Sequence, residues 1–174
     1  MDCNPELIAA AQNNTAKLGF SDRFALHTGE LADTRFLENL RMEASPVQLV
    51  MANPPWRLVG LPATEARRKA LFGDKGTFPL FASAASSLLE EDGRFACIIS
   101  PDRLQDMLAA LNGAGLTPYL LQYIHKQKTS PATFVLIEAR KGAHAKPSVA
   151  EPIALYGPER FFTLESLAFC PFLR

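Results

Sequence analysis

The sequence lacks several features that would assign it to a class at once. Its 174 residues contain no apolar run near the roughly 20 residues that a membrane-spanning helix needs. The start, residues 1–6, has neither the basic nor the apolar region of a signal peptide. Its three cysteines, Cys3, Cys97 and Cys170, form no Cys-x-x-Cys pair, which argues against structural zinc and fits a reducing, cytoplasmic compartment.

The sequence also has no excess of charge of either sign. The 18 Lys and Arg residues balance the 18 Asp and Glu residues, so overall charge gives no argument for a nucleic-acid partner. His27, His125 and His144 show no metal-ligand spacing, and we expect no metal site. With 48% apolar and 21% charged residues, the whole chain, 1–174, is expected to form a single domain with a hydrophobic core.

The most informative stretch is 47–56. Five of the six residues Val47–Ala52 are apolar, which predicts a strand buried on both faces. The sequence Asn-Pro-Pro-Trp follows at 53–56. Neither proline can donate a hydrogen bond to a sheet, and Pro54 favours an extended conformation at Asn53, so the chain leaves the sheet as a stiff loop. Ligands of open α/β sheets bind beyond the carboxyl ends of strands, and we expect a site here.

These residue types suit a reaction at an exocyclic amino group on a planar ring. The side-chain oxygen of Asn53 and the carbonyl of Pro54 can accept the two amino hydrogens, while Trp56 stacks on the ring, a contact worth about 1–3 kcal/mol per base. No strong base is needed if the positioned nitrogen attacks a charged methyl donor in line. The structural alternative is a strand exit with a buried tryptophan.

Apolar periodicity and capping residues predict alternating helices and strands. The short connector 126–132 predicts an antiparallel hairpin, so the fold class is α/β, a mostly parallel doubly wound sheet with an antiparallel last strand. No strand is followed by a Gly-rich loop, and Gly113-Ala114-Gly115 fits a helix C-cap. The expected helices cover 5–18, 33–42, 78–89 and 102–111, and the expected strands cover 23–27, 47–52, 94–100, 119–125 and 133–139.

Asn-Pro-Pro-Trp at 53–56 resembles the motif of S-adenosylmethionine-dependent methyltransferases that modify adenine, guanine or glutamine nitrogens. From Asp2 onward the chain resembles the bacterial tRNA (adenine-N6)-methyltransferase family that acts on valine tRNA beside the anticodon. The segments that carry this resemblance are 2–7, 27–31, 53–56, 63–67, 95–101 and 135–142.

The resemblance implies a Rossmann-like class I methyltransferase sheet, S-adenosylmethionine as cofactor, tRNA as partner and a monomer. Asp2 would bind the cofactor ribose hydroxyls, although a solvated terminal residue remains the alternative. Glu30, where the family usually has Asp, would accept from the cofactor adenine, with Leu31 and Asn53 also at the cofactor. Catalysis falls to Asn53, Pro54 and Trp56, the last replacing the commoner Tyr or Phe. The family's Gly-rich loop lies upstream of residue 1, so the chain is expected to begin about one strand-helix-strand unit late.

Two basic segments, 57–75 and 126–146, are candidates to contact RNA phosphates. A solvated face is the alternative for each. The candidate residues are Arg57, Arg67, Arg68, Lys69, Lys126 and Lys128.

The sequence therefore predicts N6-methylation of adenine in tRNA, with three alternatives. The same chemistry fits a guanine in ribosomal RNA or a glutamine in a release factor. A non-catalytic remnant is the remaining class, because the cofactor loop is missing, and methyl-donor binding would separate it from the enzymes.

Overall fold

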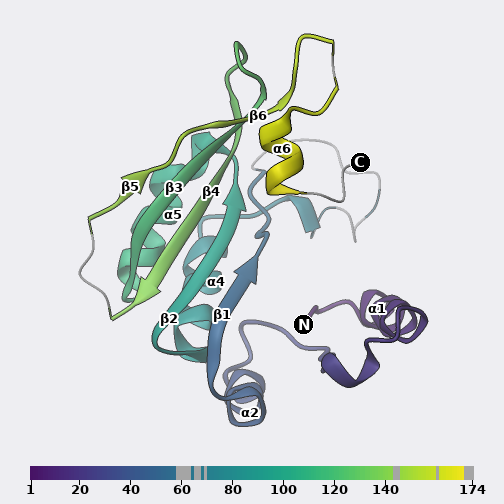
Figure 1. Ribbon diagram of the computed structural model, residues 1–174. Coiled ribbons are helices and arrows are strands. Elements are labelled where there is room, and N and C mark those ends of the chain that lie inside the picture. Colours follow the sequence, from purple (N-terminus) through teal and green to yellow (C-terminus); the bar gives the residue numbers. More distant parts are fainter. Residues whose placement is uncertain (58–63, 65–67, 69, 143–145, 160, 171–174) are drawn as a thin grey trace. The chain divides into compact units, whose positions relative to one another are not determined.

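A computed structural model of the chain, shown in Figure 1, describes residues 1–57, 64, 68, 70–142, 146–159 and 161–170. These residues fall into two compact units, Met1–Ala44 and Ser45–Arg174. The single domain expected from composition stays a prediction. Among the described helices, none combines the length and apolar character that a membrane span requires.

The unit Met1–Ala44 holds the two helices that capping residues predict. The first, α1 (Pro5–Lys17), begins with a proline after Asn4, whose side chain accepts a hydrogen bond from the Glu6 amide at 2.9 Å. The second, α2 (Thr34–Ala44), begins where the Asp33 carboxylate accepts from the Phe36 amide at 3.1 Å. Both helix predictions are confirmed.

The strand predicted at 23–27 is wrong. A 3₁₀ helix, η1 (Ser21–Arg23), covers its start, and the following residues pair only through one parallel bridge between Asp2 and Thr28. The Asp2 amide donates to the carbonyl of His27 at 3.2 Å, and the Gly29 amide donates to the carbonyl of Asp2 at 3.1 Å. A strand needs a ladder, and within the described residues Asp2 is the only partner that this segment has.

The unit Ser45–Arg174 is built on a six-stranded sheet with the order β1-β2-β4-β3-β5, in which β6 also pairs with β3. All pairings are parallel except those of β4, which runs antiparallel to β2 and β3. The predicted α/β class and the 126–132 hairpin are confirmed, and two short strands follow the antiparallel one. The strands are β1 (Val47–Ala52), β2 (Leu89–Ile99), β3 (Leu116–Gln127), β4 (Ala132–Lys141), β5 (Ser148–Val149) and β6 (Ile153–Tyr156).

Two helices, α4 (Thr77–Leu88) and α5 (Leu104–Gly113), lie on one face of this sheet (Figure 1). A short 3₁₀ helix, η2 (Pro101–Arg103), joins β2 to α5, and Gly115 with φ +73° follows the end of α5, as the predicted C-cap requires. A last helix, α6 (Leu164–Phe169), is tied to β6 by the Ser166 hydroxyl, which donates to the Leu155 carbonyl at 3.0 Å. The centre of the core is made of side chains exposed by 1% or less, among them Phe78, Phe95, Ile99, Met107, Leu111 and Val135.

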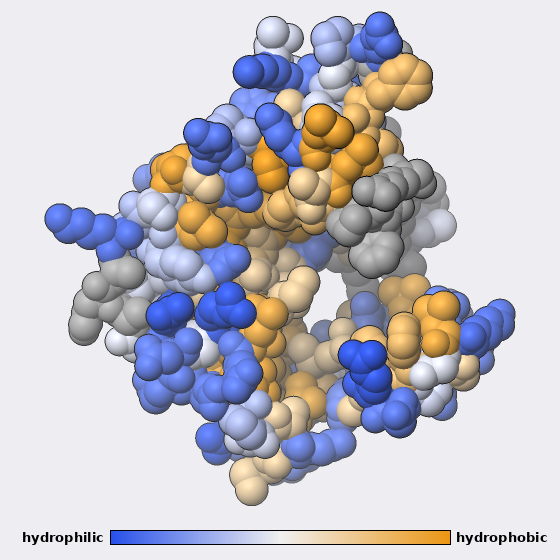
Figure 2. Space-filling model, viewed as in Figure 1, coloured by the Kyte–Doolittle hydropathy of each residue, from blue (hydrophilic) through white to orange (hydrophobic). Residues whose placement is uncertain are grey.

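The prediction that β1 is buried on both faces is wrong. Val50 and Ala52 pack against the core, but Leu49 is 43% exposed and Met51 is 74% exposed. Alternate residues of a strand point to opposite faces, and the helices α4 and α5 cover only one face. Figure 2, which looks onto the other face, shows apolar side chains gathered over β1 and β2.

Candidate active site

The stretch 53–56 leaves β1 at its carboxyl end, as predicted. Asn53 is exposed, Pro54 is fully buried and Trp56 is half-buried. The buried proline ring fixes the turn out of the sheet while the side chain of Asn53 stays accessible. A pocket of about 200 Å³ opens beside them, and its lining residues are Asn53, Pro54, Pro55, Trp56, Ala70, Leu71, Ile98 and Phe134.

The backbone after Trp56 is held by a second segment of chain. The Arg57 amide donates to the Leu71 carbonyl at 3.0 Å, and the Gly73 amide donates to the Arg57 carbonyl at 3.1 Å. Together they form an isolated parallel bridge between Arg57 and Phe72. The Asn-Pro-Pro-Trp loop is therefore fixed by backbone hydrogen bonds at its far end as well as by β1.

Among the described residues, the indole of Trp56 contacts the Phe134 ring and the Arg57 guanidinium. The Phe134 ring, at the start of β4, meets it edge-on with centroids 6.2 Å apart and an interplanar angle of 73°. The Arg57 guanidinium lies over the indole, 5.3 Å from the ring centroid. Arg57, predicted as an RNA contact, thus lies beside the predicted stacking platform. A base that stacks on that indole face would have to displace the guanidinium.

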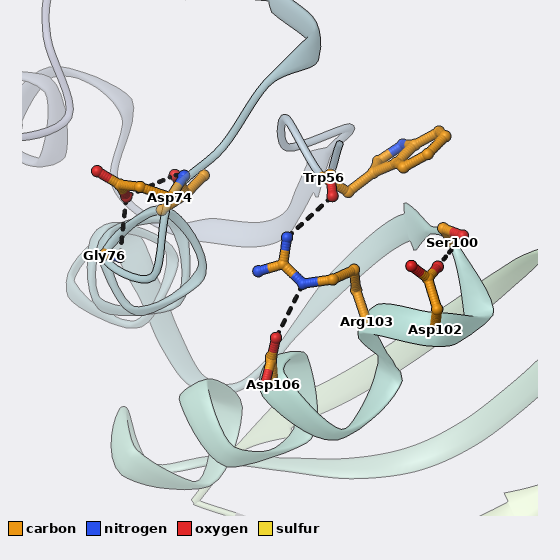
Figure 3. Close-up of polar contacts among 8 residues, drawn as sticks. Trp56, Asp74, Gly76, Ser100, Asp102, Arg103 and Asp106 are labelled. Carbon is orange, nitrogen blue, oxygen red and sulfur yellow. Dashed lines mark hydrogen bonds and ion pairs between the residues drawn. The ribbon is translucent and has the colours of Figure 1, made fainter. Parts of the chain in front are cut away.

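Arg103, which no sequence motif marked as a site residue, binds this loop from η2. Its Nη1 donates to the carbonyl of Trp56 at 2.9 Å, and its Nε donates to the Asp106 carboxylate at 2.8 Å. Figure 3 shows the guanidinium between these two acceptors, with the indole turned away from it. The available signal was a basic residue soon after a proline at the end of a buried strand, Pro101.

The carbonyl role predicted for Pro54 faces a steric condition. The whole residue is less than 2% exposed, so its carbonyl oxygen is covered. An amino group could reach that oxygen only if the covering atoms move when the substrate binds. The role of Pro54 stays a prediction, whereas the side chain of Asn53 is accessible without any movement.

Of the predicted cofactor residues, Asp2, Glu30 and Leu31 lie in the unit Met1–Ala44, and Asn53 lies in the unit Ser45–Arg174. The bridge between Asp2 and Thr28 brings two parallel segments side by side, and Glu30 follows two residues later. The half-buried Asp2 is oriented by the Asn4 amide, which donates to its Oδ1 at 2.8 Å, while Glu30 is exposed and Leu31 half-buried. Two carboxylates at the ends of adjacent segments suit hydroxyl and amino donors.

The predicted RNA contacts lie in different parts of the chain, and the structure describes only some of them. Lys126 and Lys128 are exposed at the β3–β4 turn, at the carboxyl end of β3. Since β1 and β3 run in the same direction, these lysines lie at the same edge of the sheet as Trp56. Arg68 is exposed, but it is not without a partner. Arg67 and Lys69 lie outside the described residues.

Two other reactive side chains, Cys97 and His125, have structural surroundings. Burial raises the pKa of the Cys97 thiol to about 12, so it is not a nucleophile near neutral pH, and its predicted place in the core is confirmed. The ring of His125 is held by a 2.7 Å hydrogen bond between its Nδ1 and the Ser130 carbonyl. Within the described ranges, no group of three or more His, Cys, Asp or Glu side chains could hold a metal ion.

Comparison with known proteins agrees with this geometry. No protein-family model matches the chain. A predicted O-methyltransferase of Agrobacterium tumefaciens superposes with a TM-score of 0.69 over 98% of this chain and 73% of that one, at 20% identity. The chain has a methyltransferase fold. A putative rRNA methylase of Clostridium thermocellum shares this fold, with a TM-score of 0.51, 20% identity, and coverage of 79% and 72%.

The chain is also similar in sequence to two curated methyltransferases. Two curated tRNA1(Val) (adenine(37)-N6)-methyltransferases from strains of Porphyromonas gingivalis are 32% and 31% identical over 109 residues. The match covers 62% of this chain and 42% of each relative, so it spans less than half of their length. The resemblance drawn from the sequence motifs is confirmed by these relatives.

Proposed function

We propose that the protein transfers a methyl group from S-adenosylmethionine to the exocyclic N6 of an adenine in tRNA, the adenine beside the anticodon of valine tRNA. The observation that carries this proposal is the exposed Asn53 at the carboxyl end of β1, in a loop fixed on both sides and followed by Trp56. The similarity to the Porphyromonas gingivalis enzymes supports the choice of substrate.

The role of the loop is to orient the target amine. The Asn53 side-chain oxygen accepts one amino hydrogen, the Pro54 carbonyl accepts the other once it is uncovered, and Trp56 stacks on the base. Orientation of this kind lowers the barrier because the nitrogen is held for in-line attack before the reaction begins. The fixed dipole of Asn53 also stabilises the positive charge that develops on the nitrogen.

S-adenosylmethionine would supply the methyl group from a positively charged sulfur, which would leave as a neutral thioether, while the methylated nitrogen would lose one proton to water. In this proposal the carboxylate of Asp2 binds the ribose hydroxyls, Glu30 accepts from the adenine amino group, and Leu31 supplies apolar contact. Ionised carboxylates only accept hydrogen bonds, so both suit hydroxyl and amino donors. Asn53 would also lie at the cofactor, because the methyl group and the target nitrogen must meet there.

The tRNA would be bound through its phosphates by the exposed lysines Lys126 and Lys128 and by Arg57, Arg67, Arg68 and Lys69. The first two support the proposal because they lie at the sheet edge that carries Trp56. In the proposal the protein acts as a monomer in the cytoplasm.

Nucleoside analysis of the methylated RNA and amino-acid analysis of the methylated protein test the substrate. The protein is incubated with labelled S-adenosylmethionine in three separate reactions. One contains unmodified valine tRNA, one contains ribosomal RNA and one contains a release factor. We expect label in N6-methyladenosine from the tRNA. Label in methylguanosine or methylglutamine instead would assign one of the alternatives, and donor binding without transfer to any of the three would contradict the proposal.

A further inference from the structure

Arg103 is a buried charged residue that the proposed chemistry does not use. Its exposure is 4%, against 62% for the Asp106 side chain that pairs with it. A buried charge is costly unless it is paired and hydrogen-bonded. Within the described part of the chain, every buried side-chain nitrogen and oxygen has a hydrogen-bond partner. Arg103 donates to the Asp106 carboxylate and to the Trp56 carbonyl.

The three contacts fix the direction of the guanidinium. Nε donates to Asp106 on α5, at 2.8 Å, and the guanidinium lies over the Phe78 ring of α4, 4.5 Å from its centroid. Because the guanidinium is planar, these two contacts leave Nη1 with one direction, toward the carbonyl of Trp56 at 2.9 Å. The Trp56 carbonyl is the first backbone acceptor after the Asn-Pro-Pro sequence.

We propose that Arg103 is a positioning residue that sets the orientation of the Trp56 peptide, and through it the stacking platform and the Asn53 amide. This inference rests on the proposed function for its effect on methyl transfer. Contacts with Asp106 and Phe78 alone would satisfy a role limited to joining α4 and α5. The bond to Trp56 extends the effect of this buried cation to the loop at the carboxyl end of β1.

Lysine cannot replace arginine in this role. A lysine ammonium is a point charge without the planar fork, so it cannot direct one donor to Asp106 and a second, fixed donor to Trp56. The inference therefore predicts that Arg103→Lys keeps the charge and loses the orientation of the loop. A merely electrostatic role would be restored by lysine.

The test uses the only tryptophan of the chain, Trp56, as an internal probe. Acrylamide quenching and time-resolved anisotropy of Trp56 fluorescence are measured in the folded protein for Arg103→Met and Arg103→Lys. Lys141→Met is the matched control, because Lys141 is also a cation bound to backbone carbonyls, those of Ser86 and Leu89. We expect both Arg103 variants to increase quenching and local motion of the indole, and the control to leave both unchanged.

Kinetics supply the second readout. Misplacement of the platform should lower kcat with valine tRNA on the order of 100-fold and change the donor affinity little. If Arg103→Met does not fold, Asp106→Ala, at an exposed site, removes one of the two contacts that aim Nη1. Asp106→Ala should increase the acrylamide quenching of Trp56, as the Arg103 variants do.

Unchanged Trp56 fluorescence in the folded Arg103 variants, or in Asp106→Ala where those do not fold, would overturn the inference, whatever the activity. Restoration of both readouts by Arg103→Lys would also overturn it. A wild-type protein that transfers no methyl group to tRNA would overturn the proposed function instead. A changed fluorescence in that case would still support the fixing of the Trp56 peptide by Arg103.

Discussion

Gly73 lies directly against the carbonyl oxygen of Pro55. A β-carbon built on Gly73 would lie 2.3 Å from that oxygen and 2.9 Å from the Thr77 hydroxyl. Real β-carbons do not approach backbone oxygens so closely, so no residue with a side chain fits here unless the loop moves. Because Gly73 has no side chain, the backbone before α4 can pack directly against the Asn-Pro-Pro-Trp loop, which is also fixed by hydrogen bonds.

Gly73→Ala is expected to displace the Pro55 carbonyl. The cost of such overpacking is about 1–3 kcal/mol in the free energy of unfolding. We also expect reduced methyl transfer, because the displaced peptide carries the loop between Asn53 and Trp56. Chemical denaturation and transfer assays check both. Gly113→Ala is the control, since nothing lies within 4 Å of its β-carbon, and an equal loss in both variants would contradict the account.

Lys141→Met is expected to destabilise the end of α4. Lys141 Nζ, on β4, donates to the Ser86 carbonyl at 2.9 Å and to the Leu89 carbonyl at 2.7 Å. Loss of hydrogen bonds from a charged donor typically costs about 1.5–3 kcal/mol. Urea denaturation measures the change. Lys128→Met, at an exposed position, should stay within about 0.5 kcal/mol of the wild type, and similar losses in the two variants would refute this reason.

Asp74 is expected to make stability depend on pH in the acid range. The Thr77 hydroxyl and the Gly76 amide donate to its carboxylate and lower its pKa from the ordinary 3.8. A carboxyl with a lowered pKa in the folded state stabilises the fold above its unfolded pKa, and the effect is lost as pH falls through the folded pKa. Asp74→Asn should therefore have a lower free energy of unfolding than the wild type at neutral pH. The two free energies should converge below the folded pKa of Asp74. The same difference in free energy of unfolding between the two proteins at every pH would exclude this role.

The double variant Lys126→Ala, Lys128→Ala is expected to weaken tRNA binding and its salt dependence. Each lost phosphate contact should lower the slope of log affinity against log salt concentration by about 0.7–0.9. Fluorescence-detected titrations over a salt series measure the slope. Lys17→Ala, at the end of α1, is the control. An unchanged slope in the double variant would move these lysines to a solvated face.

Local signals in the sequence were sufficient for β1, for α1 and for the start of the site. The apolar run of β1 and the two prolines after Asn53 are read from adjacent residues, and α1 is read from its own Asn4 cap. Each of these predictions depends on chemistry within a few residues. The structure agrees with them because tertiary contacts do not oppose the local preference.

The misses all depend on partners that are distant in the sequence. Whether Leu49 and Met51 are buried depends on what covers that face of β1, which an apolar run cannot say. Arg103 meets Trp56 across 47 residues, and Phe134 reaches the same indole from β4. The segment 23–27 carries strand-like residues but lacks a ladder partner. Periodicity specifies a face and never its partner.

The central claim is that Asn53 holds the amino group that is methylated. The most direct measurement is single-turnover methyl transfer to valine tRNA by the wild type and by Asn53→Ala, with donor affinity measured on the same samples. We predict a loss in the transfer rate on the order of 100- to 1000-fold and a donor affinity within a few-fold of the wild type, by analogy with the loss of one preorganised polar group in other active sites. Transfer at the wild-type rate by Asn53→Ala would contradict the account.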